Sequence, residues 1–154
     1  MHFRITGLPA EPFADLFSLT DEALAARRAM RVIADSDHGY PCRVSLTDAT
    51  PGQSLILLNY EHQAADSPFR SSHAIYIREG EQQYDEIDEV PDQLRRRMLS
   101  VRGFDQQGML RDADVAPGTA LEPLIDRLLG DDRIAYLHIH MARPGCYAAR
   151  VDRA

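Results

Sequence analysis

The end of the chain contains the sequence feature that most restricts the fold. Two apolar stretches, Ile134–Met141 and Cys146–Val151, flank the four residues Ala142-Arg143-Pro144-Gly145. A Pro-Gly pair between two apolar runs is typical of a tight turn, so the pattern predicts a C-terminal β-hairpin. Strand patterns outnumber helix patterns along the chain and do not alternate with them regularly. This arrangement favours an α+β fold with a mainly antiparallel β-sheet.

Other segments have the composition of short strands. Ser54–Tyr60 is apolar without interruption, which is typical of a central strand covered on both faces. Ser72–Arg78 is expected to pair with it in antiparallel orientation, across a polar loop that runs from Glu61 to Ser71. The remaining strands are predicted at Phe3–Thr6, Cys42–Leu46, Leu99–Phe104 and Met109–Ala113.

Two or three short helices are predicted as well. Thr20 is suited to cap a helix that includes Ala23–Met30, and Pro91 fits the first position of a second one. Leu121–Leu129 has apolar residues at helical spacing and is followed by Gly130, a common helix end. The 154 residues suffice for one ordinary domain and not for two, so we expect a single globular domain over residues 1–154.

The basic residues limit the chemistry of the protein. All 17 are Arg, and the chain has no Lys. This excludes Schiff-base enzymes, P-loop nucleotide hydrolases and protein kinases, which all need a Lys amine. The net charge of −7 argues against nucleic acid or an anionic membrane as a partner.

The cysteines and the first residues indicate a compartment. Cys42 and Cys146 are the two thiols, too few for a four-thiolate zinc site. The chain begins without the run of about 7–15 apolar residues that a secretion signal requires, and its longest apolar run is Leu55–Leu58. We therefore expect a cytoplasmic protein with reduced thiols.

The first candidate site lies in the predicted hairpin. His138 and His140 are two residues apart, so in a strand both imidazoles project from one face, beside Tyr136. Such a pair is able to supply two metal ligands, or a base and its neighbour. The alternative is a half-exposed sheet face on which the two His have no special role.

The second candidate site flanks the polar loop. Asn59-Tyr60-Glu61-His62 precede the loop and Ser72-His73 follow it, so antiparallel pairing brings His62 and His73 to one end of the sheet. The alternative is that Asn59, Ser71 and Ser72 are turn and capping groups that satisfy nearby backbone groups.

Together these segments predict one shared site. His62, His73, His138 and His140 are the candidate catalytic residues, and His62 or His73 is expected within about 8 Å of His140. The candidate ligand-binding residues are Asn59, Tyr60, Glu61, Ser72, Tyr136 and Arg143, the last as a clamp for an anionic group.

A divalent metal on the His residues is compatible with their chemistry, but no zinc-protease spacing is present. Cupins also carry an H-x-H strand, but Pro144 and Gly145 occupy the positions of the glutamate that cupins need. The histidine triad needs a third alternating His, and Tyr136 or Ala142 stands there instead. Neither the metal nor the cofactor is therefore fixed by the sequence.

Arg95, Arg96 and Arg97 follow an acidic stretch that begins at Glu79. They are suited to pair with these acids, or to bind a phosphate or carboxylate. Consecutive helical positions diverge around the helix axis, so the three are not expected to form one anion pocket.

Several separate strings resemble a known bacterial family. They are Gly7-Leu8-Pro9, Pro41-Cys42-Arg43-Val44-Ser45-Leu46, Leu57-Leu58-Asn59-Tyr60-Glu61-His62-Gln63, Ser71-Ser72-His73-Ala74-Ile75 and the segment from His138 to Val151. Together they are similar to the family catalogued as domain of unknown function 1203, over essentially the whole chain. The resemblance implies a bacterial single-domain protein and brings no activity, substrate or catalytic residue.

Two functions follow from the residues. One is a small-ligand or metal-binding protein, with an enzyme as one option, whose site lies between the loop after Tyr60 and the final hairpin. The other is a non-catalytic interaction or regulatory module, for which the His residues are incidental. A pocket with converging His favours the first, and dispersed His with an exposed apolar patch favours the second. The oligomeric state is left open, with a homodimer as one option.

Overall fold

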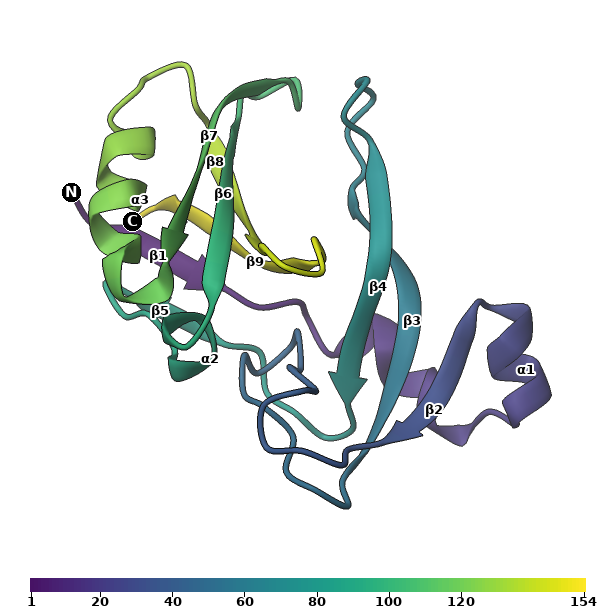
Figure 1. The fold of residues 1–154 in the computed structure, drawn as a ribbon. Helices are drawn as coiled ribbons and strands as arrows, with labels where there is room; N and C mark the ends of the chain where they lie inside the picture. Colours follow the sequence, from purple (N-terminus) through teal and green to yellow (C-terminus); the bar gives the residue numbers. More distant parts are fainter.

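The computed structural model describes residues 1–154 and contains two antiparallel sheets with short helices around them (Figure 1). The larger sheet has six strands in the order β5-β1-β9-β8-β6-β7 and the smaller has three in the order β2-β3-β4. The larger sheet consists of β1 (Phe3–Thr6), β5 (Asp85–Ile87), β6 (Met98–Phe104), β7 (Leu110–Pro117), β8 (Tyr136–Met141) and β9 (Tyr147–Arg153). The smaller consists of β2 (Ala29–Ile33), β3 (Ser54–Gln63) and β4 (Ser71–Arg78). The predicted α+β class is confirmed.

The predicted hairpin is formed by β8 and β9. Leu137, Ile139 and Met141 alternate along β8 and are buried in the core on one side of the sheet. Helix α3 (Leu121–Leu129) covers that side (Figure 1), and its buried residues Leu121, Ile125 and Leu128 pack into the same core. Gly130 follows the helix directly, so both predicted ends of α3 are confirmed.

A second core lies between the two sheets. Ile56 and Leu58 of β3 and Ile75 of β4 pack there, together with Tyr147 of β9. The 3-10 helix η1 (Glu11–Ser18) and helix α1 (Asp21–Ala26) close this core with Phe13, Leu16 and Leu24. The opposite face of β8, which carries His138 and His140, is therefore turned toward the smaller sheet.

The first helix is shorter than the sequence pattern predicts. Helix α1 ends at Ala26, and the predicted helical residues Ala29 and Met30 belong to β2. Arg28 has a φ of 55°, a left-handed conformation that stops a helix and redirects the chain. The pairing of β2 with β3 overrides the helix propensity of the Ala and Arg residues.

The prediction of a strand at Cys42–Leu46 is wrong. Pro41 and Cys42 make only isolated bridges, to Asp48 and Tyr76. The chain turns back at once, because Leu46 has a φ of 52°. Cys42 and Val44 are still buried in the second core, which accounts for their apolar character.

Several smaller differences concern the ends and the exposure of other elements. Strand β3 continues to Gln63, beyond the predicted end at Tyr60, and Leu57 is half-buried although its neighbours are covered. The acidic stretch contains the short strand β5, which pairs with β1. Pro91 precedes helix α2 (Asp92–Arg95) rather than starting it, and the other helix is the 3-10 turn η2 (Gly118–Ala120). No helix is both long and apolar enough to cross a membrane.

Replacing Thr20 by Ala is expected to lower the free energy of unfolding by about 1 kcal/mol. The Thr20 hydroxyl accepts a hydrogen bond from the Ala23 backbone N–H at 3.2 Å, which satisfies one free donor of α1. Urea denaturation measures the change, with Thr20→Ser as the control because it keeps the hydroxyl. Equal stability of the Ala variant and the native protein would contradict this role.

Candidate metal centre

His138 and His140 lie on the face of β8 that is turned toward the smaller sheet. Only 4% of the surface of His138 and 1% of that of His140 is exposed. In the sheet, His138 is opposite Arg102 of β6 and Arg150 of β9. The alternative of a half-exposed sheet face is therefore wrong, since both side chains are buried.

His62 reaches the same place from the end of β3. The register of β3 with β4 shifts between Glu61 and Gln63, so His62 is the extra residue of a β-bulge. Its ring centroid lies 4.9 Å from that of His140 and 6.1 Å from that of His138. The expected proximity of His62 to His140 is confirmed. The contact joins β3 of the smaller sheet to β8 of the larger one.

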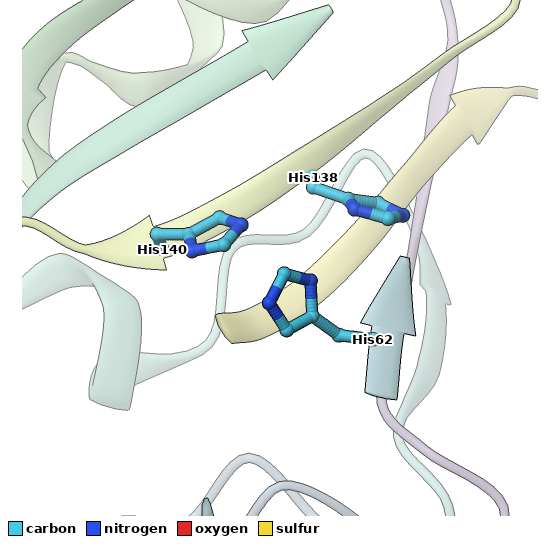
Figure 2. A group of neighbouring side chains, drawn as sticks. All are labelled: His62, His138 and His140. Atoms are coloured by element: carbon cyan, nitrogen blue, oxygen red, sulfur yellow. The ribbon is translucent and has the colours of Figure 1, made fainter. Parts of the chain in front are cut away.

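The three imidazoles converge on one point (Figure 2). Each offers one ring nitrogen, and these three nitrogens all lie within 4.8 Å of one another. Each ring also has one buried nitrogen without a hydrogen-bond partner: Nδ1 of His62, Nδ1 of His138 and Nε2 of His140. Buried polar atoms are normally satisfied, because an unpaired one costs about 1–3 kcal/mol. Three such atoms in one group therefore indicate a shared ligand.

The backbone fixes the protonation of one ring. Nδ1 of His140 lies 3.0 Å from the carbonyl oxygen of Gly145, in the turn of the hairpin. A carbonyl only accepts, so Nδ1 carries the proton and Nε2 presents its lone pair. This is the contact through which metal-binding His residues are commonly oriented.

Burial keeps the three imidazoles neutral. It lowers the pKa of His62 to about 4 and the pKa values of His138 and His140 to about 3. The guanidinium of Arg102 contributes to the lowering of all three pKa values. His62 also disfavours a charge on His138 and on His140, and His140 disfavours a charge on His138. At neutral pH the group thus offers unprotonated nitrogens, the form in which imidazole binds metal.

Aromatic rings surround the group. His62 stacks on Tyr147 at 5.4 Å between centroids, with 7° between the ring planes. Tyr136 packs against His138 at 5.2 Å, and its hydroxyl accepts a hydrogen bond from Nε2 of Gln63 at 3.0 Å. These contacts surround the imidazoles with aromatic rings.

The remaining predicted residues lie outside the group. Asn59, Glu61 and Ser72 are exposed, because strand alternation turns them away from the second core, and Glu61 pairs with Arg70 at 2.9 Å. Tyr60 packs against Phe13 in the second core.

His73 and Arg143 are also separate from the three imidazoles. His73 is close enough for its charge to affect the pKa values of His62 and His140, but it does not join the group. Arg143 is exposed in the hairpin turn. Both line a neighbouring cleft instead.

Three neighbours of the group were not predicted. Tyr147 faces His140 across the hairpin, a position that the four-residue turn already implied. Gln63 reaches the group only through the bulge, and Arg102 only through the pairing of β6 with β8. Neither of these contacts has a local sequence signal.

Residues 39–153 match the model of a family described as protein of unknown function, DUF1203. The chain belongs to this family. No curated protein and no solved structure matches the chain. The matched range includes His62, His138 and His140, so the three imidazoles lie within the family region.

Proposed function

We propose that this DUF1203 member binds a divalent transition metal ion of the zinc class through His62, His138 and His140. Two observations carry the proposal: each of the three rings has a ring nitrogen within 4.8 Å of the others, and each ring has one buried nitrogen without a hydrogen-bond partner. Imidazole is the ligand that zinc, iron and nickel share, and zinc is the most common of these in such sites.

The geometry supports this proposal. Ring nitrogens on one tetrahedral zinc ion are roughly 3.3 Å apart, given Zn–N bonds of about 2.0–2.1 Å. The spacing of up to 4.8 Å needs only small ring rotations to reach that value. Packing alone is a weaker explanation, because apolar side chains would fill the same space without three unpaired nitrogens.

Three protein ligands leave one position of a tetrahedral ion free. This is the arrangement of catalytic zinc sites, whereas structural sites use four protein ligands. An ion held by three neutral ligands would keep its full charge, and the chemistry it would supply is the activation of water. Arg102 has no carboxylate partner, and its positive charge would favour a negatively charged group beside the ion. The proposed centre is therefore suited to hydrolytic chemistry.

The proposal is tested by metal titration. Protein depleted on a chelating resin is expected to bind one equivalent of Zn²⁺ in competition with a chromophoric chelator, with a dissociation constant below about 1 µM. Co²⁺ in its place is expected to give the intense visible absorption of four-coordinate cobalt. Binding of less than half an equivalent of either metal at saturation would refute the proposal.

A further inference from the structure

A cleft of about 670 Å³ lies between the two sheets, apart from the three imidazoles. Its walls come from β3 and β4 on one side and from β8, the hairpin turn and the segment after α2 on the other. Its volume is typical of small-molecule sites, which have about 300–1,000 Å³. Apolar groups such as Leu57, Met98 and Met141 form part of the lining.

The charges in this cleft are all of one sign. Four Arg residues line it, and no Asp or Glu does: Arg43, Arg96, Arg97 and Arg143. The whole chain has a net charge of −7, so this concentration of positive charge is opposite to the average of the molecule. A cleft lined by one sign of charge concentrates ions of the other sign.

Two of the four guanidinium groups have carboxylate partners. Arg97 pairs with Asp48 at 3.0 Å, and Arg96 makes a longer, exposed contact of 3.5 Å to Asp92. Arg143 has no ion pair and no hydrogen-bond partner in the protein, and its side chain is exposed. Its guanidinium is therefore available to a ligand.

Arg43 is the second guanidinium without a carboxylate partner, although only 1% of its surface is exposed. It donates to the carbonyl oxygens of Tyr147 and Pro41, and its Nη2 lies 2.9 Å from Sγ of Cys146. A guanidinium has five N–H donors, so two of them have no acceptor here. Burial without an anion disfavours its charged form and lowers its pKa. An anion in the cleft would compensate this buried charge.

We propose that this cleft binds a small organic anion, with a phosphate or carboxylate group attached to a partly apolar body. The guanidinium groups supply paired donors that match the oxygens of such a group. The apolar part of the lining accommodates the body of the ligand, and the volume is that of a small-molecule site. This site is independent of the proposed metal centre, whose three imidazoles do not line it.

The experiment measures binding of phenyl phosphate, benzoate and inorganic phosphate by isothermal titration calorimetry. The protein is depleted on a chelating resin, so that no ion at the His group contributes, and chloride keeps the ionic strength constant. Phenyl phosphate or benzoate is expected to bind with a dissociation constant of about 1 mM or lower, and inorganic phosphate more weakly because it has no apolar body. The tighter of the two aromatic probes identifies the anionic group.

Two variants with the same change of charge separate the cleft from general electrostatics. Arg143→Gln is expected to weaken binding of the tighter probe about tenfold, the effect of one hydrogen bond to a charged group. Arg27→Gln is the control, since Arg27 lies in the segment after α1 and pairs with Asp15. The affinity of this variant for the same probe is expected to stay within about twofold of the native value. The proposal is overturned if no probe gives saturable binding, or if the two variants weaken binding equally.

Discussion

Replacing His138 by Ala is expected to lower the affinity for Zn²⁺ more than about 100-fold, because loss of even an outer-shell partner of a ligand costs about 10–100-fold. The same result is expected for His62→Ala and His140→Ala, since each ring supplies one of three converging nitrogens. Competition titration against a chromophoric chelator measures each affinity. Circular dichroism of each variant shows whether the fold is kept.

The matched control is His73→Ala. His73 is the fourth imidazole of the candidate set, but it lines the Arg-rich cleft and does not belong to the group of three. Its zinc affinity is expected to stay within about threefold of the native value. A similar loss in the His73 variant and the three ligand variants would show that zinc binds elsewhere.

The parts of the fold that follow from local patterns were predictable. Helix α3 has both the spacing of apolar residues and a following Gly130, so its ends coincide with the predicted ones. The final hairpin has a turn sequence between two apolar runs, and strand alternation places His138 and His140 on one face. These features depend on neighbours within a few residues.

The errors arise where distant pairing decides the conformation. Ala29 and Met30 follow good helix formers but pair with Leu58 and Leu57 of β3. Cys42–Leu46 has strand composition but finds only one bridge to β4, and its chain reverses at Leu46. No local pattern identifies these partners.

The candidate site was predictable to the same extent. The pair on β8 follows from alternation, whereas the approach of His62 to that pair depends on the bulge at the end of β3. The predicted loop from Glu61 to Ser71 is shorter in the structure, because β3 continues to Gln63 and β4 begins at Ser71. Glu61 therefore belongs to β3, where it is exposed and pairs with Arg70. The bulge at His62 decides which side chains reach the six-stranded sheet, and its signal lies in the register with β4 rather than in the sequence around it.

The metal-free protein is expected to lose stability as the pH falls from about 7 to 5, before most carboxylates take up protons. In the folded state the pKa of His62 is about 4 and those of His138 and His140 are about 3, below the unfolded value of 6.5. Between these values the unfolded chain binds protons that the folded protein does not, so acid favours unfolding. The stabilising contribution of the neutral imidazoles is complete above pH 6.5 and falls below it. Each imidazole contributes a loss of up to about 2 kcal/mol by pH 5.

Urea denaturation of resin-treated protein at several pH values between 7.5 and 5 measures this loss. With three imidazoles acting together, the expected decrease is several kcal/mol, a large fraction of the usual 5–15 kcal/mol of a folded protein. His62→Gln removes one of the three groups that take up a proton on unfolding. About a third of the decrease is therefore expected to disappear in this variant. A decrease of the same size in the native protein and the variant would mean that His62 is protonated equally in both states, and that it does not face the other two rings in a closed, neutral group.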